Sequence, residues 1–420
     1  MKPGNWIALS TKMAQENWEN VFYIQDIDGK VEMFNDIVMN ILYKTMHERT
    51  VRFHPSDKPW MTCHIKTQIK ARQRAFSRRD KTNYDCRCKK VSTLMSKAKG
   101  VYYQNKTKDY RKSNPEKWFK SIFSLAGADG TPASLTTNPT NDRLSDLVEK
   151  LQTAFTKPWK NMETENASRL PIDTVQHLLK ETPPPLPSIG QVKMALRQLK
   201  TKKATGVDGI PAWFLKQYCE DLAPVVRNII ISSISQCKYP TLYKHALITP
   251  IAKINPPKDI ENDFRQISVL PQLAKVLEKI QLQLNSQDLK FKDNQHAFLS
   301  DRSTVSALIS TSQKWFDATD NSKLGRKGTH AIFLDFRKAF DLVDHVILLY
   351  KLASMNVTKS FWLWTQNFLS GRSQQVKLRE MLSSSACRCP TAFCDITYVI
   401  QCAYRRPRRY HPKYFKRKYF

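Results

Sequence analysis

Two acids in the stretch from Thr329 to Leu352 are the residues whose types and spacing suggest chemistry. The stretch reads THAIFLDFRKAFDLVDHVILLYKL, in which Asp335 ends an apolar run and Asp341 follows six residues later. The apolar run Ala331–Phe336 predicts a strand that is buried on both faces. A carboxylate at the end of such a strand loses its hydration, so Asp335 needs a compensating partner.

Residue types alone leave two partners open for Asp335. One is an Arg or Lys side chain, of which the chain has 68. The other is a hard cation such as Mg²⁺, which takes carboxylate oxygens and bridges substrate phosphates. Asp341 differs, because it stands where a helical pattern begins at Phe340. We therefore expect Asp341 to be the N-cap of a helix that carries Asp344 in its first turn.

The composition favours a polyanionic partner. The 420 residues carry 68 Lys and Arg against 37 Asp and Glu, a formal net charge of +31. Nucleic acid is the first candidate and an anionic membrane the second. No apolar run is long enough to span a bilayer, and the N-terminus lacks the core of a signal peptide. We therefore expect an intracellular protein, in the nucleus or the cytoplasm, without a membrane partner.

The nine cysteines do not suggest a disulfide framework, because their number is odd and their spacing irregular. Cys63 with His64, and Cys86 with Cys88, are weak candidates for a zinc site. One residue separates Cys86 from Cys88, whereas zinc sites usually have about two to four between ligands. We expect reduced thiols on basic helices.

Residues 58–120 predict basic amphipathic helices. This segment carries 19 Lys and Arg against four acids, and Ile65, Ile69 and Phe76 recur at helical spacing. The charges indicate either a solvated helix face or contacts to phosphates, and both interpretations stay open. The interleaved aromatic side chains either stack on bases or pack into a core.

Helical and strand patterns alternate further along the chain, which is typical of the α+β and α/β classes. We expect a loop at 127–141, a helix at 142–155, a Pro-rich domain boundary at 181–187, a helix capped by Ser188, helices at 212–218 and 223–236, a strand at 246–254, and a strand or turn from 267 that becomes a helix after Pro271.

Several segments, in order, resemble landmarks of the reverse transcriptases of non-LTR (LINE-type) retrotransposons, especially the jockey and CR1-like group. They are LKTKKATGVDGIP (199–211), PIAK (250–253), NDFRQISVLPQLAKVLEKI (262–280), QHAFLSDRSTVSAL (295–308), FLDFRKAFDLVDHVILLYKL (333–352) and FLSGRSQQVKL (368–378). Upstream, DKPWMTCHIKTQIKARQRAF (57–76) resembles the basic segment that joins endonuclease to polymerase in these elements. The chain is therefore expected to begin after the endonuclease.

The resemblance implies an α+β fold, namely a partial right-hand polymerase with fingers and an incomplete palm over residues 188–378. Residues 1–130 are expected to form a basic helical linker region, and residues 131–187 a loop, a short helix and a Pro-rich linker. Residues 379–420 are expected to be an unmatched basic tail that contains cysteines.

The resemblance also implies roles for single residues. Asp335 would hold two Mg²⁺ ions, assisted by the backbone carbonyl of Phe336, and Phe340 would be the steric gate against ribonucleotides. Lys253 and Arg265 would hold the incoming triphosphate. The weaker assignments are Gln295 and Arg302 on the template side, and Lys66, Lys70, Arg72, Arg74, Arg78 and Arg79 for nucleic-acid binding. The implied partners are an RNA template, a DNA primer or target, and deoxynucleoside triphosphates, whereas the oligomeric state is not indicated.

The sequence departs from the family pattern in ways that bear on activity. Gln266 stands where the family usually has Pro, and Ala297 where it usually has Gly, which suggests relaxed constraint on the backbone. The sequence contains no Asp-Asp pair, the motif that supplies the second metal-binding carboxylate in the family. Asp395 follows Asp335 too closely in sequence to replace the missing second carboxylate. Because a two-metal site needs both carboxylates, we expect this polypeptide alone to be inactive as a polymerase.

Two other hypotheses stay open. One is a non-enzymatic RNA- or DNA-binding remnant that acts through its basic helices. The other is a degenerate product without a selected function. The composition changes abruptly from Met381, with four cysteines and the end RRPRRYHPKYFKRKYF, which resembles translation in a shifted reading frame.

Overall fold

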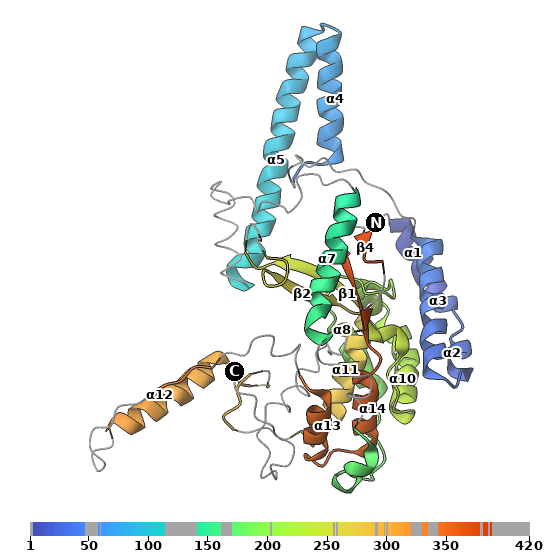
Figure 1. The fold of residues 1–420 in the computed structure, drawn as a ribbon. Coiled ribbons are helices and arrows are strands. Elements are labelled where there is room, and N and C mark those ends of the chain that lie inside the picture. The colour runs from blue at the N-terminus through green and yellow to red at the C-terminus, as the bar shows by residue number, and fades with distance from the viewer. Residues whose placement is uncertain are drawn as a thin grey trace. The chain divides into compact units, whose positions relative to one another are not determined.

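The computed structural model divides the chain into two compact units, one of residues 48–134 and one of the remaining residues. The structure describes residues 3–46, 58, 60–113, 141–160, 170–201, 204–254, 257, 259–289, 293–297, 299, 301–320, 330–334, 343–378, 381–384 and 387–388. Mixed helices and a small sheet give the larger unit an α+β architecture, as expected (Figure 1). None of the described helices is both long and apolar enough to cross a bilayer.

Most of the larger unit is helical and shares one hydrophobic core. Two indole rings anchor that core: Trp362 Nε1 donates to the Leu349 carbonyl oxygen at 2.9 Å, and Trp364 Nε1 donates to Ser233 Oγ at 3.0 Å. Both rings are fully buried with their one polar group bonded, so they add apolar contact without an unpaired donor. The helices of this unit besides α7 are α1 (Pro3–Gln15), α2 (Glu19–Tyr23), α3 (Ile27–Thr45), α8 (Ile189–Arg197), α9 (Ala212–Gln217), α10 (Cys219–Ser235), α11 (Gln272–Leu284), α12 (Thr304–Asp320), α13 (His345–Ala353) and α14 (Lys359–Leu369), with short 3-10 turns at Ile172–Thr174, Gln176–Leu178 and Thr241–Lys244.

The sheet has the order β2-β1-β3-β4, with β5 also paired to β3. Strand β1 lies antiparallel to β2 and parallel to β3, so both of its edges are occupied. Helix α7 packs on one face of the sheet through Val148, Leu151 and Phe155. Gln152 of α7 also bonds the sheet directly, because its side chain donates to the Gln374 carbonyl oxygen at 3.1 Å and accepts from the Val376 amide at 3.0 Å. The elements are α7 (Asn141–Lys160), β1 (His245–Ala252), β2 (Phe264–Val269), β3 (Ser373–Leu378), β4 (Met381–Leu382) and β5 (Cys387–Arg388).

The smaller unit contains a helical hairpin of α4 (Cys63–Ser77) and α5 (Lys81–Ser113). Thr62 caps α4 by accepting a hydrogen bond from the Ile65 amide at 3.3 Å. The chain reverses at Arg79, which adopts a φ of 57°, a left-handed conformation that is uncommon for a residue other than glycine. The helices expected over residues 58–120 are therefore present in the part of this segment that the structure describes.

Several expected elements are confirmed because local chemistry determines them. Ser188 caps α8 in a capping box, in which its hydroxyl accepts from the Gln191 amide and Gln191 accepts from the Ser188 amide. Helix α9, strand β1 and helix α11 lie where the patterns predicted them, and α10 begins earlier than expected, at Cys219. The sheet also continues beyond Leu378, because β4 and β5 both pair with β3. These two short strands lie in the segment that was expected to be an unmatched tail.

The predicted buried strand at Ala331–Phe336 is wrong for the residues described. Residues 331–334 form no strand, and Ile332, Phe333 and Leu334 are each at least 80% exposed. A strand buried on both faces needs paired neighbours, and none of the described strands pairs with residues 331–334. The apolar residues of this run predicted a buried strand, but the described strands supply no partner for it.

The predicted N-cap of the following helix is also wrong. Asp344, not Asp341, caps α13, and its carboxylate accepts from the Val346 amide at 2.8 Å and the Ile347 amide at 3.1 Å. The buried face of the helix is His345, Leu348, Leu349 and Leu352, whereas Ile347, which the predicted helical pattern included, is 41% exposed. Both acids have cap chemistry, and the position of the buried face decides between them.

Two segments lie in the larger unit although a boundary or a linker was expected there. Helices α1 to α3 contribute to its main core, with Phe34 of α3 almost completely buried. The segment before the prolines is hydrogen-bonded to the loop between α13 and α14, since the Lys180 amide donates to the Val357 carbonyl oxygen at 2.9 Å. The Pro-rich segment therefore does not separate compact units.

Candidate nucleotide-binding face

The β1–β2 hairpin places Lys253 and Arg265 on the same face of the sheet. Ile251 lies opposite Arg265, and residues opposite each other in an antiparallel pair share a face. Lys253 lies two positions after Ile251 and one residue beyond the end of β1, so the alternation of the strand assigns it to the same face. The ladder continues to this position, because the Lys253 amide donates to the Asp263 carbonyl oxygen at 2.7 Å. Two cations twelve residues apart in sequence thus belong to one surface.

This surface is open, whereas the opposite face of the hairpin is buried. Ile248 and Phe264 of the opposite face pack against α7 and are at most 7% exposed. Lys253 and Arg265 are both exposed, and beside them Ile251 and Ile267 are 49% and 43% exposed. We call these four residues the open hairpin face.

The two cations are not equally available to a ligand. Lys253 Nζ donates to the carbonyl oxygen of Asn262 at 2.6 Å, and this bond occupies one of the three N–H donors of its ammonium group. Arg265 forms no ion pair with any carboxylate in the described part of the chain. The guanidinium of Arg265 is therefore the more accessible of the two groups.

The loop that joins the strands is held in place by local bonds. Asp259 accepts from the Glu261 amide at 2.8 Å, and its own amide donates to Asp263 Oδ2 at 2.9 Å. Lys157 of α7 forms an ion pair with Glu261 at 2.5 Å. This ion pair is exposed and contributes little stability, but it links the loop to the helix behind the sheet.

Arg302 contacts Gln295 through the backbone of Gln295. Arg302 Nη1 donates to the Gln295 carbonyl oxygen at 2.7 Å, and the same group bonds the Asp293 carbonyl oxygen. The guanidinium thus closes the turn that precedes α12. A contact to a template strand would compete with these bonds.

The residues proposed for metal binding and sugar selection lie outside the described residues. These are Asp335, Phe336 and Phe340. Among the described residues, no group of three or more His, Cys, Asp or Glu side chains is placed to hold a metal ion.

A buried acid in the 199–211 segment was missed by sequence reasoning. Asp208 is 4% exposed, and burial raises the pKa of its carboxyl group to about 7, although the amides of Ile210 and of Asp208 itself oppose the shift. A Cβ on Gly206 would lie 2.4 Å from the backbone nitrogen of Pro271, so this loop packs tightly against the junction of β2 and α11. An acid flanked by glycines in an otherwise basic loop was the available signal.

The six basic residues predicted to bind nucleic acid all lie on or just after α4. Lys70, Arg74, Arg78 and Arg79 are exposed, whereas Lys66 and Arg72 are half-buried.

Comparison with known proteins identifies the part of the chain that contains Lys253, Arg265 and Asp335. Residues 253–391 match the family described as reverse transcriptase (RNA-dependent DNA polymerase). Residues 253–391 are similar to part of a reverse transcriptase domain. The match includes β2 to β5 and ends beyond Leu378, at which the sequence resemblance was expected to stop.

Relatives of this reverse transcriptase region come from transposons of Drosophila melanogaster. A probable RNA-directed DNA polymerase from transposon BS is 26% identical over 200 residues, which are 46% of this chain and 21% of the relative. A probable RNA-directed DNA polymerase from transposon X-element is 26% identical over 163 residues, 37% of this chain and 17% of the relative. The chain thus spans about a fifth of the length of these relatives. The resemblance to reverse transcriptases of non-LTR retrotransposons is confirmed.

Proposed function

We propose that this chain belongs to the machinery of RNA-directed DNA synthesis of a non-LTR retrotransposon. In this proposal residues 188–378 are fingers and the first part of a palm, and the open hairpin face binds the phosphates of an incoming deoxynucleoside triphosphate. The supporting observation is that Lys253 and Arg265, distant in sequence, share one exposed face inside the reverse transcriptase match.

The two cations suit a triphosphate for different reasons. The ammonium of Lys253 is a compact charge on a flexible stem and can follow one phosphate oxygen. The planar guanidinium of Arg265 can donate two parallel hydrogen bonds to oxygens of one phosphate. A flexible and a rigid donor together select a chain of phosphates over a single carboxylate.

The proposal separates nucleotide binding from incorporation. Asp335 is the proposed Mg²⁺ ligand, with the Phe336 carbonyl assisting and Phe340 limiting the sugar. Polymerisation by two metal ions needs a second carboxylate, and the 420 residues contain no Asp-Asp pair. We propose that the polypeptide of these residues binds deoxynucleoside triphosphates without incorporating them, in complex with an RNA template and a DNA primer.

The binding half of the proposal is tested with a labelled deoxynucleoside triphosphate and Mg²⁺ in a titration of the full chain. Lys253→Gln and Arg265→Gln are each expected to weaken binding by about tenfold, the loss of one charged phosphate contact. Arg265→Lys keeps the charge but loses the paired geometry, and we expect an intermediate affinity. The control Lys150→Gln removes the same charge from α7, where Lys150 forms only an exposed ion pair.

Equal affinities for all four variants and the unmodified chain would refute the nucleotide-binding role. The incorporation half is tested separately on a primed RNA template. Incorporation of a labelled nucleotide that Asp335→Ala abolishes would show that the polypeptide is active after all.

A non-enzymatic nucleic-acid-binding role is the second candidate, and the cationic surface of α4 favours it. This candidate predicts that nucleic acid binds regardless of Lys253 and Arg265. It is not exclusive of the first, because the two surfaces lie on different units of the chain.

A further inference from the structure

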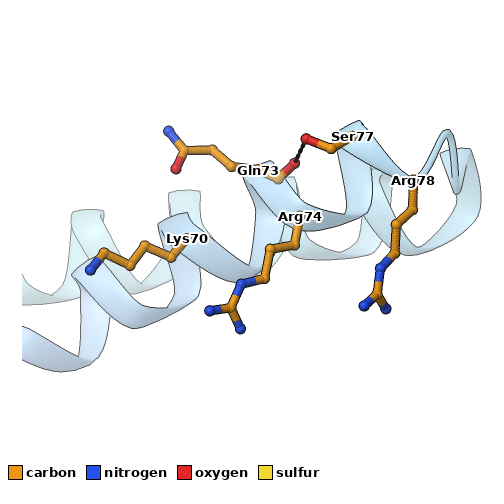
Figure 2. Close-up of a pocket in the computed structure, with 5 residues that line it drawn as sticks. All are labelled: Lys70, Gln73, Arg74, Ser77 and Arg78. Carbon is orange, nitrogen blue, oxygen red and sulfur yellow. Dashed lines mark hydrogen bonds between the residues drawn. The ribbon is translucent and has the colours of Figure 1, made fainter.

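We infer that one exposed face of α4 binds the phosphodiester backbone of a nucleic acid strand through Lys70, Arg74 and Arg78. These three residues, with Gln73 and Ser77, line a shallow hollow of about 300 Å³ (Figure 2). We call the three cations the α4 stripe. The inference concerns the smaller unit only. It rests on the second candidate function, nucleic-acid binding, and not on the proposed polymerase function.

The spacing of the α4 stripe gives a row of cations along the helix axis. The residues are four positions apart, so successive charges leave the helix about 6 Å apart on neighbouring turns. Figure 2 shows the Arg74 and Arg78 side chains extending to the same side of α4. A row of this kind suits a linear polyanion, in which successive phosphates repeat along a strand, better than a single small anion.

The structure separates the stripe from the other basic residues nearby. Lys66 and Arg72 are half-buried, and Arg79 lies in the turn after the helix with its φ of 57°. All three stripe residues are exposed, so their charged groups are hydrated and available. Three of the six basic residues predicted to bind nucleic acid therefore form one exposed surface of the hairpin.

The charge of the stripe is not neutralised within the described part of the chain. Helix α4 contains no Asp or Glu, and residues 60–105 carry twelve Lys and Arg against two Asp. No ion pair in the described residues involves Lys70, Arg74 or Arg78. Ser77 Oγ donates to the Gln73 carbonyl oxygen at 3.1 Å, which leaves the Gln73 side-chain amide as the neutral donor beside the stripe. Mixed charged and amide donors are typical of contacts to phosphate oxygens.

The remaining side chains favour a nucleic acid over a membrane surface. A helix that lies on a bilayer needs a continuous apolar face next to its basic one. On α4 the side chains of Ile65 and Ala75 are buried, and the Phe76 ring, although exposed, contacts Tyr84 at 5.5 Å between ring centroids. No aromatic side chain lines the hollow, so bases have no stacking partner there. The contact is therefore to the backbone and independent of base sequence.

Binding of the full chain to a 20-nucleotide single-stranded RNA and to a DNA duplex of the same length, over a range of salt concentrations, tests the inference. The variant Lys70→Gln/Arg74→Gln/Arg78→Gln is expected to bind at least about tenfold more weakly near physiological salt. Its log–log salt slope should fall by about 2 on single-stranded RNA, since each lost phosphate contact removes about 0.7. The control Lys89→Gln/Lys97→Gln/Lys99→Gln removes the same charge from exposed positions of α5.

A local measurement removes the influence of other basic segments. Lysine acetylation followed by mass spectrometry should show that bound nucleic acid protects Lys70 but not Lys97. Arg74→Lys/Arg78→Lys keeps the charges and is expected to bind within about threefold of the unmodified chain, with circular dichroism confirming helix content in each variant. Dependence on the stripe for RNA alone, DNA alone or both supports the inference and identifies the natural strand.

Three results would overturn the inference. They are an equal loss in the stripe and control variants, a Lys70 that stays reactive in the complex, and stripe-dependent binding to vesicles of anionic lipid without stripe-dependent binding to nucleic acid. None of these results would affect nucleotide binding through Lys253 and Arg265, so the two proposals fail separately.

Discussion

A buried carboxylate makes the stability of the larger unit depend on pH. The pKa of Asp208 is about 7 in the folded chain against an ordinary 3.8, because burial penalises the charged form. The folded state therefore holds a proton that the unfolded state releases, and stability decreases as pH rises from about 4 to about 7. Burying the charged form of Asp208 above pH 7 costs about 4 kcal/mol.

Asp208→Asn should remove this penalty, because the amide has the shape of the acid and no charge to bury. We expect the variant to be more stable than the unmodified chain at pH 8 and close to it at pH 4, as measured by denaturant unfolding at both values. Burial also lowers the pKa of His345 to about 4. This group acts in the opposite direction, because the folded state loses stability as pH falls from 6.5 to 4. This contribution is common to both chains and cancels in the comparison. A pH-independent difference between them would contradict the assigned pKa.

At the scale of the element, substitution of the N-cap of α13 tests whether Asp344 or Asp341 caps this helix. Asp344→Ala should lower the free energy of unfolding by about 1 kcal/mol, because the Val346 and Ile347 amides lose their acceptor. Asp341→Ala is the matched comparison, since Asp341 was the cap that the sequence pattern predicted. Thermal or denaturant unfolding of both variants separates the two assignments. A larger loss for Asp341→Ala would restore the sequence-based one.

The elements that sequence predicted well are those set by local chemistry. Ser188 with Gln191 forms a cap within four residues, and the strand at β1 and the helix after Pro271 follow from β-branched content and from proline geometry. The 331–334 run was mispredicted because a buried strand requires neighbours, which local sequence does not contain. Asp208 was missed for the same reason, since its burial comes from packing against segments far away in the chain.

The candidate site shows the same division. Spacing alone gave no reason to group Lys253 with Arg265, and only the resemblance to reverse transcriptases did so. The register of β1 with β2 then placed both on one face, which is a property of strand pairing. The roles of Asp335, Phe336 and Phe340 rest on the resemblance alone, because these residues lie outside the described part of the chain.

At the scale of the whole molecule, the two units differ in how much apolar surface holds them together. In the described part of the hairpin, Ile65, Ala75 and Val91 are the buried apolar side chains. The larger unit has an extensive core that includes residues of α3, α10, α11 and α14. Because helices in proteins are stabilised mainly by packing, the hairpin should be the less stable unit.

We therefore predict two unfolding transitions in a denaturant titration of the full chain, with the hairpin unfolding first. Gly100→Ala should shift only the first transition to higher denaturant, by about 0.5–1 kcal/mol, because Gly100 lies inside α5 with nothing within 4 Å of an added Cβ. Gly206→Ala should shift only the second, to lower denaturant, because its Cβ would collide with the backbone of Pro271. Hydrogen exchange of amides in α5 and α11 assigns each transition to its unit. A single transition that both substitutions move would show that the two units unfold as one.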